Sequence, residues 1–217
     1  GLSVSALLTD MNQPLAPAAG NALEVLCAID YLTGKSRPAR LHEVTLALCA
    51  EGLVAAQLAP GLDAARAKLE AALDSGAAAE RFARMISLLG GPSDLLEHPE
   101  KHLAKAPVVR DIRSRASGTI TGLDTRALGL AVVALGGGRL RSDQEIDPAV
   151  GLAGIVELGT QVEAGQSLMK IHARTEDDAK TAEKMILEAI EIGNRTAQEY
   201  PLVRKRITAS DIPGAVQ

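Results

Sequence analysis

The chain has 217 residues, of which 47% are hydrophobic and 23% charged, and its formal net charge is −4. This length suffices to bury the core of one large domain or two small ones. Mild acidity argues against a nucleic-acid or anionic-membrane partner, because both need clustered Lys and Arg, and the near absence of aromatic residues removes the platforms on which unpaired bases stack.

No segment of the sequence is suited to membrane insertion or export. No apolar run reaches the roughly 18 residues that span a bilayer, and no basic region followed by an apolar stretch resembles a signal peptide. The two cysteines, Cys27 and Cys49, fall within apolar helical patterns, which favours reduced core thiols over a disulfide. We therefore expect a cytoplasmic protein.

The first hundred residues predict one strand followed by helices. Residues 2–9 have the pattern of a buried strand, and because such a strand needs neighbours on both sides, we expect further sequence upstream. Two prolines in residues 11–17 predict a loop. Apolar residues at helical spacing then predict helices near residues 20–33, 41–58, 63–73 and 82–89. The last of these has the apolar stripe of a helix that rests on a core.

The composition changes near residue 106, where shorter elements begin. We predict strands at 106–112 and 117–120, a helix at 124–135 capped by Asp124, an extended region at 150–173, a helix from Thr175 to about Ile190 and a strand at 200–208. This order predicts an α/β fold for residues 1–105, followed by an α+β module for residues 106–217.

Asp10 is the first candidate functional residue. It lies where the predicted strand meets a loop, and ligands of α/β sheets gather beyond the carboxyl ends of strands. A carboxylate there can act as a general acid or base, or hold a hydroxyl. The alternative is that Asp10 only turns the chain by bonding to its own backbone.

Several motifs in this sequence occur in the same order in one enzyme family. Residues 9–15, Thr-Asp-Met-Asn-Gln-Pro-Leu, and 19–25, Ala-Gly-Asn-Ala-Leu-Glu-Val, resemble the loop and helix of thymidine phosphorylases and the wider pyrimidine-nucleoside phosphorylase family. The similarity continues at 32–34, Leu-Thr-Gly, at 124–129, Asp-Thr-Arg-Ala-Leu-Gly, and at 133–138, Val-Ala-Leu-Gly-Gly-Gly. Separated motifs in a fixed order make the resemblance specific.

This resemblance implies the C-terminal half of such an enzyme. Residues 1–105 would form the later part of its α/β, glycosyltransferase-type domain, and residues 106–217 its C-terminal α+β domain, with a barrel-sandwich or hammerhead-like shape. The implied activity is that of a pentosyltransferase: thymidine and phosphate are converted reversibly to thymine and 2-deoxyribose 1-phosphate. Phosphate is the co-substrate, and no cofactor is expected.

The resemblance also implies partners. The family's phosphate-binding Lys, Ser and Thr and its base-binding Arg, Ser and Lys precede the part seen here, so we expect this fragment to be inactive alone. Its expected partners are thymidine or thymine, phosphate, the missing N-terminal half and, in the intact protein, the second subunit of a homodimer. No nucleic acid and no membrane are expected. The preference for thymidine over uridine is not decided by these residues.

Family likeness assigns candidate roles to residues of the loop. Asp10 matches the position that resembles the proton donor to the base in related nucleoside-monophosphate phosphorylases. The residues expected to line the substrate cleft are Thr9, Met11, Gly20 and Asn21.

Some family members bind a metal ion through two loop carbonyls and a Glu on the following helix. The matching carbonyls belong to Leu15 and Ala18, but Cys27 stands where that Glu would be. Because hard cations prefer oxygen ligands, we expect this metal site to be weak or lost.

Residues 158–171 raise a second hypothesis, a non-catalytic binding or carrier module. They resemble the hairpin framework of biotinyl and lipoyl carrier domains, whose modified lysine lies at a tight hairpin tip. Lys170 instead falls inside a strand pattern, which favours the hammerhead-like shape without a carrier function. A third hypothesis, phosphoribosyl transfer, would need an acid-rich diphosphate-binding motif that is not visible.

Three further features favour structural roles. Gly136-Gly137-Gly138 follows a predicted helix, whereas anion sites favour helix N-termini, so we predict a helix end or a mobile segment near the cleft. The four histidines lack metal-ligand spacing, and Pro99 separates His98 from His102, which favours surface or capping roles. Lys35, Ser36 and Arg37 form a short basic loop, for which a solvated connection between helices is favoured over a phosphate contact.

Overall fold

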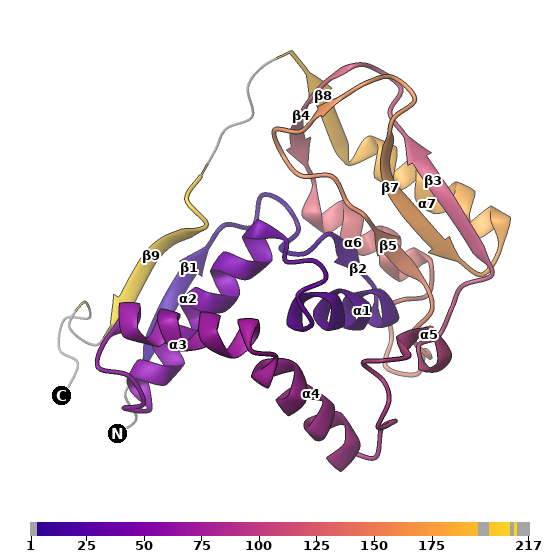
Figure 1. The fold of residues 1–217 in the computed structure, drawn as a ribbon. Coiled ribbons are helices and arrows are strands. Elements are labelled where there is room, and N and C mark those ends of the chain that lie inside the picture. The colour runs from indigo at the N-terminus through magenta and orange to yellow at the C-terminus, as the bar shows by residue number, and fades with distance from the viewer. Residues whose placement is uncertain (1–3, 195–199, 209–210, 212–217) are drawn as a thin grey trace. The chain divides into compact units, whose positions relative to one another are not determined.

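The computed structural model describes residues 4–194, 200–208 and 211. The chain forms two compact units, each assembled from segments that are distant in sequence (Figure 1). The first unit comprises residues 1–10, 30–90 and 199–217, and the second comprises residues 11–29 and 91–198. The predicted division at residue 105 concerns the domains of the intact family and stays a prediction.

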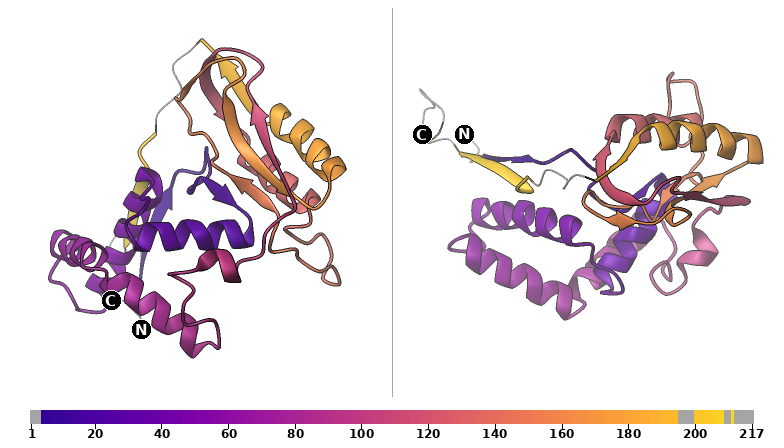
Figure 2. Two further views of the ribbon diagram at one scale, coloured as in Figure 1. Left: turned by 45° about the vertical axis from the view of Figure 1, so that its right-hand side comes forward. Right: turned by 90° about the horizontal axis from the view of Figure 1, so that it is seen from above.

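The first unit contains a two-stranded antiparallel sheet. Strand β1 (Ser5–Thr9) pairs with β9 (Val203–Thr208), the first and last strands of the chain. The predicted strands at both ends are thus confirmed where they are described, but the prediction that the first strand is buried is wrong. Its residues alternate between half-buried and exposed, because within this unit helices cover only one face of the strand pair (Figure 2).

The four helices predicted in the first hundred residues are all present: α1 (Asn21–Leu32), α2 (Ala39–Ala55), α3 (Leu62–Asp74) and α4 (Ala77–Leu88). The expectation that the last of them rests on a core is wrong. None of the residues of α4 is buried, and Leu88 is 77% exposed. Among the residues that the structure describes, no helix is both long and apolar enough to cross a membrane.

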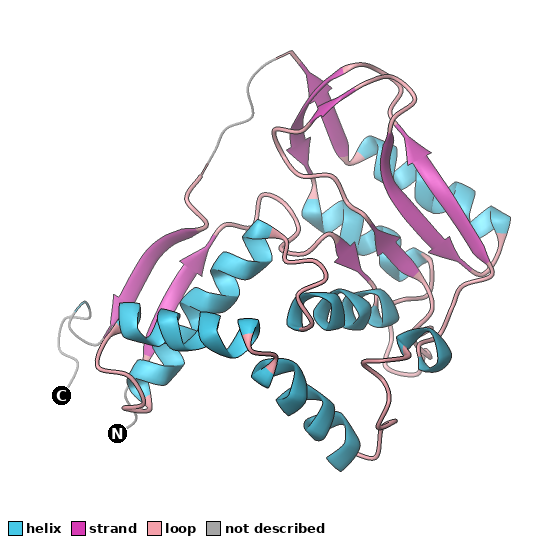
Figure 3. Cartoon of the chain, viewed as in Figure 1, coloured by secondary structure: helices cyan, strands magenta, loops and turns pink. Residues whose placement is uncertain are grey.

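The second unit is built from two antiparallel sheets and two longer helices (Figure 3). One sheet has the order β2 (Ala18–Ala19), β5 (Gly151–Ala153), β7 (Ser167–Ala173), β3 (Val108–Arg113). The other has the order β6 (Gln161–Val162), β4 (Gly118–Leu123), β8 (Ile190–Gly193). The unit also contains helices α6 (Thr125–Ala134) and α7 (Glu176–Glu188), the short α5 (Pro99–His102) and residues 21–29 of α1.

Both predicted caps in the second unit are confirmed. The Asp124 carboxylate accepts a hydrogen bond of 2.9 Å from the Ala127 amide at the start of α6, and Thr175 Oγ1 accepts one of 3.1 Å from the Asp178 amide at the start of α7. The helix from Thr175 ends earlier than predicted, because Ile190 already belongs to β8, where it pairs with Leu123 of β4.

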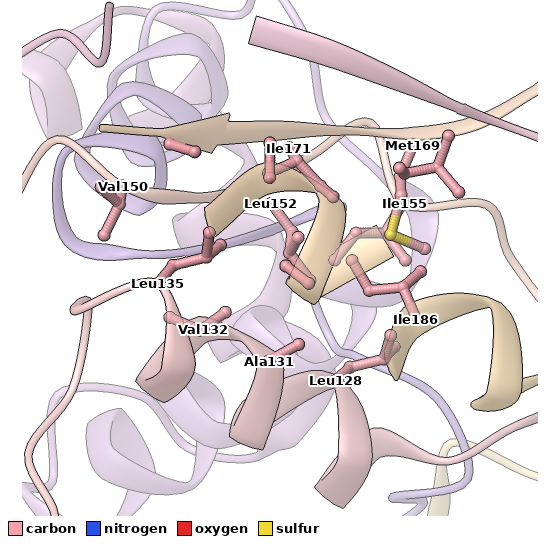
Figure 4. Close-up of a cluster of buried hydrophobic side chains, with 14 of the residues drawn as sticks. Leu128, Ala131, Val132, Leu135, Val150, Leu152, Ile155, Met169, Ile171 and Ile186 are labelled. Atoms are coloured by element: carbon pink, nitrogen blue, oxygen red, sulfur yellow. The ribbon is translucent and has the colours of Figure 1, made fainter. Parts of the chain in front are cut away.

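A large apolar cluster, beside a smaller one of four buried residues, holds the second unit together. Fifteen buried residues from α6, α7, β3, β5 and β7 and adjoining segments form its main cluster. Side chains from these elements converge, with Leu128 and Val132 on one side and Leu152 and Ile171 on the other (Figure 4). This core fixes the position of β5, against which the predicted substrate loop is anchored.

Candidate functional site

Asp10 lies directly after β1, in the first unit, and is buried. Its carboxylate accepts a hydrogen bond of 2.7 Å from Arg204 Nη2 and one of 3.3 Å from Arg40 Nη2, on different oxygens. Arg40 Nη2 also lies 3.4 Å from the Asp10 carbonyl oxygen. The Asp10 amide donates to the Leu202 carbonyl at 2.8 Å. The Asp10 side chain is only 4% exposed, and that of Arg40 11%.

We call Asp10, Arg40 and Arg204 the aspartate clamp. It joins three elements of the first unit: the end of β1, the first turn of α2 and strand β9. Arg204 also stacks on the ring of Tyr200, with 4.2 Å between its guanidinium carbon and the ring centroid, a cation–π contact that orients the side chain. A buried carboxylate held by two guanidinium groups is suited to anchoring the chain.

A second ion pair fastens β9 to α2. Arg206 donates two hydrogen bonds to the carboxylate of Glu51, one of them 2.9 Å long from Nη2 to Oε2. The Glu51 side chain is 10% exposed and that of Arg206 44%. The hydrogen bonds from Arg206 lower the pKa of the Glu51 carboxyl below its usual value, although burial opposes this shift. Arg204 and Arg206, two residues apart on one strand, thus hold Asp10 and Glu51, the two buried acids among the described residues of this unit.

This lowered pKa predicts an acid-sensitive contribution to stability. Unfolding returns the Glu51 carboxyl to its usual pKa of 4.5, so the pair stabilises the first unit fully above that pH and less as the pH falls through the lowered folded-state pKa. We expect Arg206→Gln to reduce the loss of stability on acidification, measured as the urea midpoint between pH 6 and pH 3. An unchanged pH dependence in the variant would contradict this assignment.

The loop after Asp10 belongs to the second unit, where it is tied to the start of α6 and to the segment around β5. The Thr125 hydroxyl donates to the Met11 carbonyl at 3.3 Å, and the Leu158 amide donates to Gln13 Oε1 at 2.9 Å. The Ile155 amide donates to the Pro17 carbonyl at 3.1 Å. Met11 itself is 73% exposed, so its side chain is available to a ligand.

Gly20 packs tightly against the backbone of β5. Its φ is +133°, and that of Gly151 is +150°. A Cβ on Gly20 would overlap the carbonyl oxygen of Val150 and lie 2.9 Å from the Gly151 Cα. The buried Gly20 therefore has a packing role, whereas the neighbouring Asn21 is exposed at the start of α1.

The predicted site residues are divided between the two units. Thr9, half-buried and opposite Val203, and the buried Asp10 lie in the first unit. The second unit holds the others, Met11, Leu15, Ala18, Gly20, Asn21 and Cys27. The contacts of Thr9 and Asp10 are therefore those of the first unit, and the contacts of the other predicted site residues are those of the second.

The donor set at the predicted metal position does not suit a hard cation. Ala18 lies in β2 opposite Ala153, Leu15 is 40% exposed, and the Cys27 thiol is half-buried on α1. The nearby carboxylate of Glu24 accepts a hydrogen bond of 2.9 Å from the Gly20 amide. Among the described residues no group of three His, Cys, Asp or Glu side chains is placed to hold a metal.

A cavity of about 380 Å³ lies beside the glycine-rich segment that follows α6. The residues that line it are Val133, Ala134, Gly136, Gly138, Leu140, Gln144 and Glu145. A helix C-terminus carries partial negative charge, and Glu145 adds a carboxylate, so the cavity is poorly suited to phosphate. This agrees with the prediction that Gly136-Gly137-Gly138 is not a phosphate cradle.

Lys170 lies within β7, where it is opposite Asp111 of β3 and Ala153 of β5. A lysine in a strand with neighbours on both sides cannot swing as a carrier arm must. The carrier hypothesis is therefore not favoured. His102 Nε2 lies 2.7 Å from Asp94 Oδ1, and Nδ1 of the half-buried His42 lies 3.0 Å from the Tyr31 hydroxyl.

Comparison with known proteins identifies the relatives of this chain. A family model described as the pyrimidine nucleoside phosphorylase C-terminal domain matches residues 119–193. A protein named thymidine phosphorylase from Burkholderia cenocepacia is 56% identical over 207 residues, which cover 95% of this chain and 47% of the relative. One of the same name from Burkholderia lata is 64% identical over 174 residues, 80% of this chain and 40% of the relative.

The chain is similar to a C-terminal fragment of the pyrimidine-nucleoside phosphorylase family. It spans about half the length of the curated relatives that it matches. The matched residues run from β4 to β8, so the mixed arrangement of antiparallel sheets and helices in the second unit is compatible with the family's C-terminal domain.

Sequence patterns did not indicate the contacts of Arg40 and Arg204 in the first unit or that of Glu24 in the second. The two arginines are 30 and 194 residues from Asp10 in the chain, and no local pattern indicates such pairing. The contact of Glu24 was predictable from its position, because a Glu in the first turn of a helix commonly accepts a hydrogen bond from a free backbone amide at the helix start.

Proposed function

We propose that this chain forms one half of a thymidine phosphorylase, in which thymidine and inorganic phosphate are converted reversibly to thymine and 2-deoxyribose 1-phosphate. The observation that carries the proposal is the 56% identity, over 95% of the chain, to a relative of that name. In the complete enzyme a phosphate oxygen bonds to the anomeric carbon, the bond from that carbon to the base breaks, and the base takes up a proton. Catalysis requires groups that hold the phosphate and stabilise the charge on the departing base.

We further propose that this chain supplies a wall of the substrate cleft and that the other half supplies the phosphate-binding and base-binding groups. In the second unit, Met11 and Asn21 contribute to that wall, and Gly20 shapes it by its contact with β5. Asp10 lies close to the substrate. Its role is to anchor the chain at the end of β1, because both oxygens of its carboxylate already accept hydrogen bonds from arginines. The intact enzyme is a cytoplasmic homodimer that uses phosphate as co-substrate and no cofactor.

The test is a thymidine phosphorolysis assay followed by ultraviolet absorbance. We expect no turnover by the isolated 217-residue chain and turnover by a full-length enzyme that contains it, because the half-site cannot hold the phosphate. Turnover by the isolated chain would contradict the half-site. An inactive full-length enzyme would contradict the assignment of the reaction.

A further inference from the structure

Loop 11–17, the segment of the second unit that leads into β2, is fixed at both ends and in the middle. At its ends the carbonyls of Met11 and Pro17 accept hydrogen bonds from α6 and from the segment after β5. In the middle a side chain makes the contact: Oε1 of the half-buried Gln13 accepts from the Leu158 amide at 2.9 Å. Gln13 therefore ties the centre of the loop to a segment 145 residues away.

The Leu158 amide is a firmly held donor. The Leu158 side chain packs against the cluster of four buried residues that includes Ile120 and Leu168. Before it in the chain, the Val156 amide donates to the Leu168 carbonyl of β7 at 3.0 Å. After it, the Gly159 amide donates to the Ile120 carbonyl of β4 at 2.9 Å. Because both flanks of this donor are bound to strands, the group that accepts from it is held in place as well.

The side chains of loop 11–17 suit an uncharged ligand. The loop contains no Lys or Arg, and its exposed side chains include Met11, Asn12 and Leu15. Phosphate is bound in proteins by cationic side chains or by backbone amides at a helix start. Apolar side chains with a few amide groups instead suit the faces and the polar edges of an uncharged nucleoside.

The start of α1, which follows the loop, is not suited to phosphate either. The Gly20 amide donates to the Glu24 carboxylate at 2.9 Å, and the Ala22 amide donates to the Pro148 carbonyl at 3.0 Å. Helix starts attract anions through such amides, but here Glu24 already supplies the negative charge. A phosphate at this position would meet a like charge, so the nucleoside is the better ligand for this part of the second unit.

We propose that loop 11–17 contacts the nucleoside and that Gln13 is its positioning residue. The inference rests on the proposed function, in which this chain supplies a wall of the substrate cleft. Gln13 acts through the backbone: its contact with the Leu158 amide sets the place of the adjoining Met11 and Asn12. Without the Gln13 acceptor the loop shifts, because a half-buried backbone donor that loses its partner must find another.

The test is steady-state kinetics of a full-length enzyme that contains this chain, with thymidine and phosphate varied separately. Gln13→Met keeps the side-chain length but removes the acceptor, so the KM for thymidine should rise about tenfold, while kcat and the KM for phosphate change less than about twofold. Gln13→Glu keeps an acceptor oxygen and should hold the KM for thymidine within about threefold of the unsubstituted enzyme. Faster hydrogen exchange of the Leu158 amide in Gln13→Met should accompany the loss of the contact.

Gln166→Met is the matched control. Gln166 Oε1 also accepts from a backbone amide in the second unit, that of Glu163 at 3.0 Å, but this contact closes a local turn of the chain. The substitution removes the same kind of hydrogen bond at a different place. Both KM values and the exchange of the Leu158 amide should therefore stay as they are in the unsubstituted enzyme.

Several results would overturn the proposal: an unchanged KM for thymidine in Gln13→Met, an equal rise in the KM for phosphate, or an equal effect of Gln166→Met. Gln13→Glu behaving like Gln13→Met would do the same, because the acceptor oxygen would then not be the cause. A full-length enzyme without turnover contradicts the proposed function instead. In that case thymidine, and not phosphate, should still slow hydrogen exchange at the amides of residues 11–13, and equal exchange with and without thymidine would overturn this inference too.

Discussion

Replacement of Asp10 by Ala is expected to unfold the first unit at markedly lower urea concentration, with a loss of about 3–5 kcal/mol in the free energy of unfolding. The substitution leaves the buried Arg40 without its carboxylate and releases Arg204, which joins β9 to the end of β1. Removing one partner of a buried ion pair costs more than the pair contributes, because the remaining charge stays desolvated. Asp10→Asn keeps an acceptor oxygen and should lose less.

The fluorescence of tyrosine makes this measurement specific to the first unit. Both tyrosines of the chain, Tyr31 and Tyr200, lie in that unit, and there is no Trp. Asp74→Ala is the matched control, because Asp74 also pairs with an arginine, Arg37, at 2.6 Å, but its side chain is 69% exposed. We expect that control to lose at most about 1 kcal/mol. Equal losses for Asp10→Ala and Asp74→Ala would contradict an anchoring role for the aspartate clamp.

Replacement of Gly20 by Ala is expected to destabilise the second unit by about 2–4 kcal/mol. The added Cβ would meet the backbone of Val150 and Gly151, which cannot rotate away as a flexible side chain can, and Ala rarely adopts a φ of +133°. The loss should appear in urea unfolding followed by far-ultraviolet circular dichroism and in faster amide exchange at Leu152 of β5. Tyrosine fluorescence should change little.

Gly129→Ala is the control for this experiment. Gly129 lies in α6 of the same unit, and a Cβ added there would meet nothing within 4 Å. Because Ala is favoured over Gly in a helix, we expect a gain of about 0.5–1 kcal/mol. If Gly20→Ala were tolerated as well as Gly129→Ala, the contact between Gly20 and β5 would not be a packing constraint.

A sequence motif can indicate a family without revealing the long-range contacts of its residues. The motif around residues 9–25 identifies the family, and the comparisons confirm that identification. It does not show that Gly20 contacts β5, since Val150 and Gly151 lie about 130 residues away and no pattern connects them. The partners of Asp10 were hidden for the same reason.

Helices and caps that depend on residues close together in the sequence were predictable. The caps of α6 and α7 depend on side chains that bond to amides three residues away, and the helices of the first hundred residues follow from their apolar spacing and their glycines. Periodicity indicates that a face is apolar, but not what covers it. Helix α4 has the stripe of a packed helix, yet the described residues bury none of its side chains.

Sequence periodicity, capping residues and motif order were therefore enough to predict the helices, the strands β1 and β9 and the likeness to the family. The antiparallel pairing of β1 with β9, the exposed face of β1, the aspartate clamp and the close approach of Gly20 to β5 emerged from the folded chain. The physical reason is the range of the interactions. A cap or an apolar stripe is encoded within a few residues, whereas a long-range pair depends on which distant segments gain most free energy by packing together.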